Sequence, residues 1–253
     1  MTKMNEKRFE EAKNKIIGKP KNRKGIGTLG EKTVHAVLKN YYAPDEKMHE
    51  VPIGHYVADI YTGEGIWEIQ NGNFYKIRSK LDAFLKEYPV TIIYPIPHIK
   101  WIIWIDEETG ECSPKRKSPL TGTAYRAFAE LYRIKDYLNH EKLRFIFPLV
   151  DMEEYRLLNG WSRDRKKGSC RYDRLPVTLY DEVVIEKKED YLQFLPGQLP
   201  EAFTSKDLSA TAKIPIKAAR MALHIMTYLG VTEQIGKAGK SYLYRILINR
   251  HPT

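Results

Sequence analysis

Two acidic residues, Asp59 and Glu68, are the side chains of this sequence best placed to do chemistry. They lie near the ends of two apolar, strand-like runs in the stretch VADIYTGEGIWEIQNG (57–72), joined by a glycine-bearing turn. Antiparallel pairing of these runs would bring both carboxylates to one rim of a sheet, and a hard divalent cation prefers such oxygen ligands. Solvated residues at strand edges are the alternative, because most Asp and Glu side chains are exposed. Glu68 argues against that alternative, because it stands between Trp67 and Ile69, where a carboxylate without compensation is costly.

The residues that surround the acids predict a helix, three antiparallel strands, a second helix and a buried strand, in that order. Apolar residues recur at helical spacing in the helices, and the strands alternate or run apolar with β-branched and aromatic residues. The predicted ranges are 30–42 for the first helix, 48–53, 56–61 and 65–69 for the strands, 74–85 for the second helix and 90–94 for the buried strand. Beyond them, the same criteria predict strands at 100–106, 145–150 and 177–185 and a helix at 124–138. We therefore expect an α/β protein.

The last part of the chain predicts a separate small α+β domain. It follows the linker LPGQLP at 195–200, which holds two prolines and a glycine. The expected elements are a short helix opened by a capping box at 204–207, a longer helix over 215–229, and a hairpin with strands at 231–235 and 241–248. Helix, turn, helix and hairpin in this order resemble a winged helix-turn-helix domain.

The order of elements around the two acids resembles the PD-(D/E)XK nuclease superfamily, whose restriction-endonuclease-like core runs helix, three-stranded meander, helix, strand. The family's first acid matches Asp59 and its second acid matches Glu68. Gln70 stands at the position of the lysine that is usual in the family, and glutamine cannot carry its charge. Glu31, on the first predicted helix, matches an additional glutamate that many members have.

This resemblance implies phosphodiester hydrolysis that depends on Mg²⁺ or Mn²⁺. The metal would be held by the carboxylates of Asp59 and Glu68 and the carbonyl of Ile69, and Glu31 would complete a second metal position. Gln70 would orient the attacking water by hydrogen bonding. The implied organisation is a basic N-terminal arm (1–24), a restriction-endonuclease-like domain with a mixed sheet flanked by helices (25–195), and a winged helix-turn-helix domain (196–253).

Basic residues indicate double-stranded DNA as the partner. The chain has 42 Lys and Arg against 32 Asp and Glu, a formal net charge of +10, which favours a polyanion. One stripe of the longer C-terminal helix is basic, the hairpin that follows is basic, and a polar loop near 161–171 is basic. The predicted DNA-binding residues are Lys217, Arg220 and His224 on the helix, Lys237 and Lys240 on the hairpin, and Arg163, Arg165, Lys166 and Lys167 in the loop. A solvated helix face is the alternative for the first group.

Other sequence features do not indicate a dinucleotide site, a zinc site, a signal peptide or a membrane span. Gly25 to Gly30 form a GxGxxG pattern, but charged residues rather than a buried strand precede it, so we expect no dinucleotide site. Cys112 and Cys170 lie far apart, which argues against a zinc site or a disulfide framework. The charged N-terminus and the lack of an apolar run of about 18 residues predict neither a signal peptide nor a membrane span. A cytoplasmic location is therefore expected.

The sequence as a whole predicts a Mg²⁺-dependent DNA endonuclease, with a restriction-type enzyme as the first choice. The pairing of the two domain types also resembles transposon end-cleaving endonucleases. The alternative from another class is a non-catalytic DNA-binding protein, such as a transcriptional regulator with a degenerate nuclease domain. The sequence determines neither the target site nor the oligomeric state. A homodimer is one of the oligomeric states that it leaves open.

Overall fold

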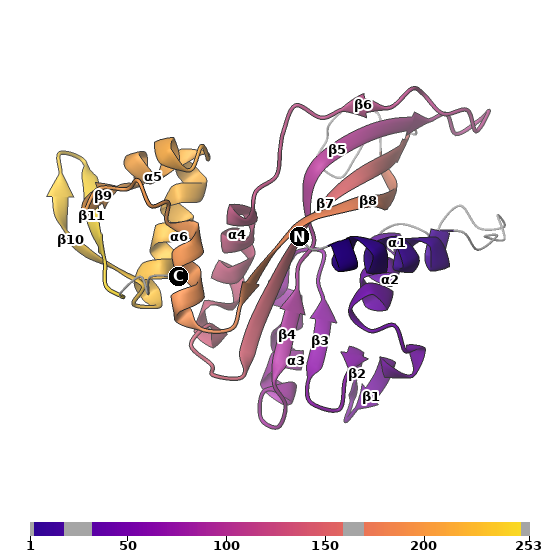
Figure 1. The fold of residues 1–253 in the computed structure, drawn as a ribbon, viewed down its shortest axis with the longest axis horizontal. Coiled ribbons are helices and arrows are strands. Elements are labelled where there is room, and N and C mark those ends of the chain that lie inside the picture. The colour runs from indigo at the N-terminus through magenta and orange to yellow at the C-terminus, as the bar shows by residue number, and fades with distance from the viewer. Residues whose placement is uncertain (1–2, 18–31, 159–169, 249–253) are drawn as a thin grey trace. The chain divides into compact units, whose positions relative to one another are not determined.

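The computed structural model describes residues 3–17, 32–158 and 170–248. It contains a mixed eight-stranded sheet with helices and a separate three-stranded antiparallel sheet (Figure 1). The predicted α/β class is confirmed at this level. The order in the large sheet is β1-β2-β3-β4-β7-β5-β6, and β8 pairs with β7.

Two compact units make up the chain, and each is assembled from three separate segments. Unit 1 comprises Met1–Asn71, Pro95–Thr123 and Pro148–Val183, and unit 2 comprises Gly72–Tyr94, Ala124–Phe147 and Val184–Thr253. The predicted limits of the arm, the nuclease domain and the winged-helix domain stay predictions.

Unit 1 begins with two helices, α1 (Lys3–Ile17) and α2 (Lys32–Tyr42). They pack together through apolar side chains: Phe9 and Ala12 of α1 are buried, and the Phe9 ring lies 5.6 Å from the ring of Tyr41. The start of the predicted basic arm is therefore a helix with a buried face. The remainder of that arm, 18–24, lies outside the described residues.

Three antiparallel strands follow α2, as the sequence predicts. They are β1 (His49–Ile53), β2 (Tyr56–Tyr61) and β3 (Ile66–Ile69), with a single 3₁₀ turn, η1 (Glu46–Met48), before them. Val51 pairs with Ala58, and Ile60 pairs with Trp67. Gly54 and Gly63 adopt positive φ values of 59° and 84° in the two turns, a conformation that glycine tolerates without strain. Short turns keep the three strands adjacent in space.

Three further strands are longer than the sequence indicates: β5 (Ile96–Ile105), β7 (Leu143–Leu157) and β8 (Cys170–Ile185). Residues 143–147 of β7 and 184–185 of β8 belong to unit 2. The short strand β6 (Arg116–Lys117) was not predicted. β5 runs parallel to β7 and β6 runs antiparallel to β5. The predictions at 145–150 and 177–185 were too short, because Glu154 and Arg174 interrupt the apolar pattern. The two charges pair in the structure, with Arg174 Nε 2.9 Å from Oε2 of Glu154.

Unit 2 contains the second half of the predicted nuclease core. Its elements are η2 (Phe74–Ile77), α3 (Arg78–Phe84), β4 (Val90–Ile93), η3 (Ala124–Arg126), α4 (Ala127–Leu131) and η4 (Tyr132–Tyr137), and β4 runs parallel to the start of β7. The predicted helix at 124–138 is divided. Ile134 leaves the helical conformation, with φ −121° and ψ 28°, at a point where its side chain is fully buried.

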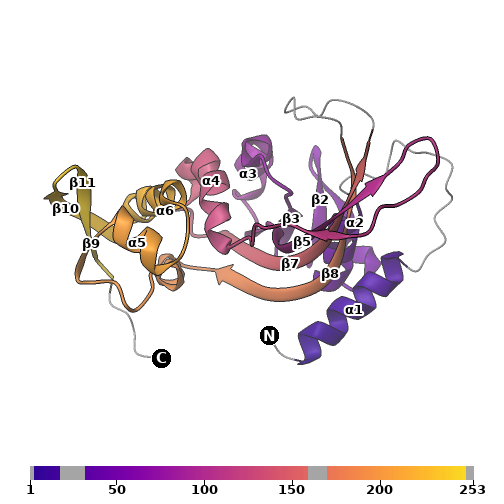
Figure 2. The ribbon, with the colours of Figure 1, turned by 90° about the horizontal axis from the view of Figure 1, so that it is seen from above.

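The C-terminal part of unit 2 follows the predicted order of helix, turn, helix and hairpin. Its elements are η5 (Lys188–Phe194), β9 (Ala202–Thr204), α5 (Ser205–Thr211), α6 (Ile216–Tyr228), β10 (Thr232–Ala238) and β11 (Ser241–Ile246), and the small sheet has the order β10-β11-β9 (Figure 2). The capping box is confirmed, because Thr204 accepts from the amide of Asp207 while the Asp207 carboxylate accepts from the amide of Thr204. Strand β9 was not predicted. No described helix is long and apolar enough to cross a bilayer.

Candidate active site

Asp59 on β2 and Glu68 on β3 lie opposite each other in the sheet. The register pairs Ile60 with Trp67, so the next pair along the two antiparallel strands is Asp59 with Glu68. The amide of Asp59 also donates to Oε1 of Glu68 at 3.4 Å. Directly opposed residues project from the same face of a sheet with their Cβ atoms about 5 Å apart. The structure therefore brings together the two carboxylates singled out in the sequence.

The two carboxylates differ in exposure. Glu68 is fully buried, with 0% of its surface exposed, whereas 15% of the Asp59 side chain is exposed. Strand alternation explains the burial, because Glu68 shares its face of β3 with Ile66, which is fully buried. The Glu68 carboxylate thus lies inside the fold, whereas the Asp59 carboxylate reaches its surface.

Two groups hold the Asp59 carboxylate in place. The amide of Ile69 donates to Oδ2 at 2.8 Å, and Nε2 of His35 lies 3.1 Å from the same oxygen. His35 lies on α2 and has 24% of its side chain exposed. Sequence reasoning missed it, although its spacing of four from Glu31 is a helical repeat and would have directed attention to it.

The other predicted site residues are placed as follows. Gln70 directly follows β3 and is half-buried, and Ile69 is buried. Glu31 lies outside the described residues, so its predicted role stays a prediction. The structure therefore places Asp59, Glu68, Ile69 and Gln70 at the end of the β2–β3 pair.

The donor set of this pair fits a hard divalent cation. Like charges directly opposite each other in a sheet destabilise it, and a cation held by both carboxylates would offset that repulsion. Asp59 and Glu68 would be its side-chain ligands. Within residues 3–17, 32–158 and 170–248, no three His, Cys, Asp or Glu side chains are grouped as a metal site.

The predicted DNA-binding residues of the C-terminal helix are exposed, but they differ in their surroundings. Lys217 and Arg220 lie in the first half of α6 and are exposed. The His224 ring, further along the same stripe, lies 5.4 Å from the ring of Tyr132 in η4. The second half of the stripe therefore faces another part of unit 2, and the first half is the better candidate for contacting DNA.

The predicted basic residues outside α6 are placed only in part. On the hairpin, Lys240 is exposed in the turn, and Nζ of Lys237 lies 5.3 Å from the centre of the Tyr242 ring. The loop residues Arg163, Arg165, Lys166 and Lys167 lie outside the described residues, so their role stays a prediction.

A second charged cluster, which the sequence did not reveal, surrounds Glu154 on β7. Lys100, Arg156, Arg171 and Arg174 all contact its carboxylate. Burial alone would raise the pKa of Glu154, but the cations, Arg174 and Lys100 foremost, outweigh that effect and hold the pKa at about 2. The contacts join residues far apart in the chain, which explains why no local pattern indicated them.

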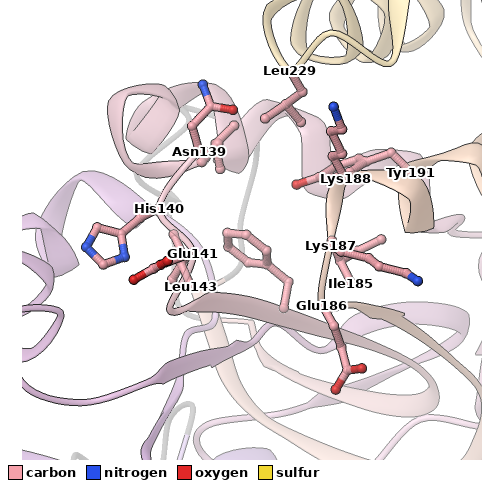
Figure 3. A pocket seen from close by; sticks show the side chains of 12 residues that line it. Asn139, His140, Glu141, Leu143, Ile185, Glu186, Lys187, Lys188, Tyr191 and Leu229 are labelled. Atoms are coloured by element: carbon pink, nitrogen blue, oxygen red, sulfur yellow. The ribbon is translucent and has the colours of Figure 1, made fainter. Parts of the chain in front are cut away.

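Unit 2 contains a pocket of about 320 Å³ that holds none of the predicted site residues. Apolar side chains such as Leu143, Ile185 and Leu229 line it, together with Tyr191 (Figure 3). The Tyr191 hydroxyl is buried without a hydrogen-bond partner among the described residues, and this burial raises its pKa. The acids of the candidate site belong to unit 1, so the pocket is not part of that site.

Comparisons with known proteins give a family and one relative. The family described as "Domain of unknown function (DUF8091)" matches residues 32–186, the segment from the start of α2 to the end of β8. A protein of Treponema pallidum (strain Nichols), described as "Uncharacterized protein", is 28% identical over 221 residues, which cover 87% of each chain. No solved structure matches the sequence.

Proposed function

The chain belongs to the family described as Domain of unknown function (DUF8091), and we propose that it is a metal-dependent DNA endonuclease. Within this proposal, α2, the β1–β3 meander, α3 and β4 form a restriction-endonuclease-like core. The elements from β9 to β11 form a winged helix-turn-helix domain. Mg²⁺ or Mn²⁺ is the proposed cofactor and double-stranded DNA the proposed substrate.

The observation that carries the proposal is the position of Asp59 directly opposite Glu68 on neighbouring antiparallel strands. Like charges directly opposite each other on neighbouring strands destabilise a sheet, so a purely structural reason for the pair is weak. Catalytic sites are places where such costs are retained. The surrounding order of helix, meander, helix and strand supports the same interpretation.

The side chains have distinct proposed tasks. When bound between the carboxylates, Mg²⁺ would stabilise charge on the phosphodiester and lower the pKa of water. Asp59 and Glu68 would hold it, and His35 and the amide of Ile69 fix the Asp59 oxygen that they contact. Gln70, directly after β3, would orient water by hydrogen bonding, a role that glutamine can take in phosphoryl chemistry.

The C-terminal elements would read the DNA. Recognition helices contact base edges through their N-terminal residues. Lys217 and Arg220 occupy that half of α6 and are exposed, and Lys240 is exposed in the hairpin turn, where it would contact phosphate.

Cleavage of supercoiled plasmid in Mg²⁺ tests the proposal. We expect the wild type to nick or linearise the plasmid and Asp59→Asn and Glu68→Gln to be inactive, because each removes a ligand while keeping the shape of the side chain. Glu64→Gln is the matched control, since Glu64 is an exposed acid in the turn between the same strands. A second readout is thermal unfolding: Mg²⁺ should raise the Tm of the wild type and of Glu64→Gln, but not of the two site variants.

A non-catalytic DNA-binding protein is the second candidate. Gln70 favours it, because the lysine usual at this position is replaced by a neutral side chain. The same experiment separates the two: wild-type protein that binds DNA but neither cleaves it nor gains stability from Mg²⁺ or Mn²⁺ would fit the second candidate and contradict the first.

A further inference from the structure

The cations that contact Glu154 lie on β5, β7 and β8. These strands are neighbours in the large sheet (Figure 2). Nζ of Lys100, on β5, lies 3.3 and 3.2 Å from the two carboxylate oxygens. Nε of Arg156, on β7, donates to Oε1 at 2.8 Å, and Nε of Arg174, on β8, donates to Oε2 at 2.9 Å. Nε of Arg171, also on β8, lies 3.7 Å from Oε2. Glu154 itself is fully buried.

Strand alternation places Lys100, Glu154 and Arg156 on one face of the sheet. Ile102 on β5 is paired with Glu154, so Lys100, two residues earlier, projects from the same face as the carboxylate. Arg156 is two residues beyond Glu154 on β7, and its guanidinium lies 5.9 Å from the centre of the Trp104 ring. This distance is within the range of a cation–π contact.

The cluster has more positive charge than one carboxylate requires. Even without Arg171, Glu154 and the three cations Lys100, Arg156 and Arg174 sum to +2 (+3 − 1). The neighbouring acids on β7 and β8 contact other groups, since Glu153 pairs with Lys115 and Asp173 accepts from Thr33. Collecting like charges around one acid is unfavourable unless a further anion shares them.

Lys100 is the partly buried member of this cluster whose pKa is shifted. Burial lowers the pKa of Lys100, and Arg174 and Arg156 lower it further, although Glu154 opposes them. The cations nevertheless reach the surface: 22% of the Lys100, 30% of the Arg156, 40% of the Arg171 and 18% of the Arg174 side chain is exposed. A guanidinium offers five N–H donors in a planar fork that matches phosphate oxygens.

Helix α2 connects this cluster with the carboxylate pair. Thr33 Oγ1 donates to Oδ2 of Asp173 at 2.6 Å, and Asp173 directly precedes Arg174 on β8. His35, two residues after Thr33, contacts Asp59. A DNA duplex bound at the cluster would therefore have a defined position relative to Asp59 and Glu68, because the start of α2 contacts both β8 and Asp59.

We propose that Lys100, Arg156, Arg171 and Arg174, organised around the buried Glu154, bind a phosphodiester of the DNA backbone. This inference rests on the proposed DNA cleavage and names the contact that positions the duplex. The buried carboxylate fixes the orientation of the guanidinium groups, and their remaining N–H donors bind phosphate oxygens. The contact carries no sequence information, because phosphates are the same at every step of the duplex.

Binding of a fluorescently labelled duplex, measured by anisotropy in EDTA at several salt concentrations, tests the cluster. Arg171→Gln is the first variant, because Arg171 is the most exposed cation and has the longest contact with Glu154. We expect several-fold weaker binding to specific and scrambled duplexes alike, and a plot of log Kobs against log salt that is shallower by about one. Arg171→Lys keeps the charge and should keep most of the slope.

A second variant and a control complete the design. Lys100→Met replaces a buried cation by an apolar side chain of similar length, so it should fold, and it should also flatten the salt dependence. Arg144→Gln is the matched control, since Arg144 is an exposed arginine on β7 with one acidic partner, Glu186. The proposal would be overturned if both cluster variants unfold like the wild type and also show the wild-type slope of log Kobs against log salt. A nucleoside monophosphate that displaces the duplex at micromolar concentration would identify a free nucleotide as the occupant instead.

The binding experiment tests the phosphate site independently of the proposed nuclease activity, because binding of DNA requires no cleavage. Wild-type protein that does not cleave DNA, with cluster variants that bind it weakly, would overturn the nuclease and keep the phosphate site. Wild-type protein that cleaves DNA, with cluster variants that bind it normally, would overturn the phosphate site and keep the nuclease.

Discussion

His35 on α2 and Asp59 on β2 are in direct contact, with Nε2 of the imidazole 3.1 Å from Oδ2 of the carboxylate. Because the amide of Ile69 donates to the same oxygen, two groups from different elements orient this acid. Helix α2 is itself anchored to β8 through the hydrogen bond from Thr33 to Asp173. The orientation of Asp59 thus depends on how α2 packs, and not on its own strand alone.

His35→Ala is expected to lower the rate of cleavage about 10- to 100-fold, the usual effect of removing a group that orients a ligand. The KM for DNA should stay the same, because His35 acts through Asp59 rather than by binding substrate. Rates measured over a range of DNA concentrations would separate the two parameters. His55→Ala is the control, since His55 is exposed in the turn between β1 and β2. Unchanged kinetics in His35→Ala would refute the positioning role.

Gln70→Lys is expected to retain or raise the cleavage rate, because it restores a cation beside the scissile phosphate. The measurement is the initial rate of plasmid nicking under conditions in which the wild type is not saturated. Asn71→Lys, one residue further along, is the matched control and should not raise the rate. A dead Gln70→Lys protein would mean that the amide of glutamine has a specific task that a cation cannot perform.

Local patterns in the sequence were sufficient for the elements close to the acids. The β1–β3 meander follows from alternation and glycine turns, and the pairing of Asp59 with Glu68 follows from the short turn between them. The two C-terminal helices follow from a capping box and a proline at the start of α6. Each of these signals is contained within about ten residues, so no tertiary information was needed.

Features that depend on distant contacts were not predictable in this way. The predicted strands at 145–150 and 177–185 stopped short of Glu154 and Arg174, because the partner that stabilises each charge inside the sheet lies on another strand. The contact of His35 with Asp59 does not follow from local spacing, since the two residues are 24 positions apart in the chain. Long-range pairing of polar groups, rather than hydrophobic periodicity, determines both features.

Glu154→Gln should make the stability of the protein less dependent on acid pH. The folded-state pKa of Glu154 is about 2, below the ordinary 4.5, so its contribution is complete above about pH 4.5 and is lost as the pH falls through about 2. This shift corresponds to about 3 kcal/mol at neutral pH. Urea unfolding at pH 7 should show the variant destabilised by roughly that amount, with the difference from wild type shrinking towards pH 2. Glu64→Gln, which changes an exposed acid, should show no such trend.

Arg220→Ala should weaken binding to a cognate duplex by about 1–3 kcal/mol and relax the preference at one base pair, because a guanidinium in the major groove can bond both acceptors of a guanine edge. Titrations of the cognate duplex and of single-base-pair variants would measure both effects. Arg245→Ala is the matched control, since Arg245 is an exposed arginine on β11 that pairs with Glu233. His224→Ala should have a smaller effect than Arg220→Ala, because its ring lies beside Tyr132 rather than in the first half of α6. If Arg220→Ala binds every duplex like the wild type, α6 does not read DNA, and a protein-interaction role for the C-terminal elements becomes the better hypothesis.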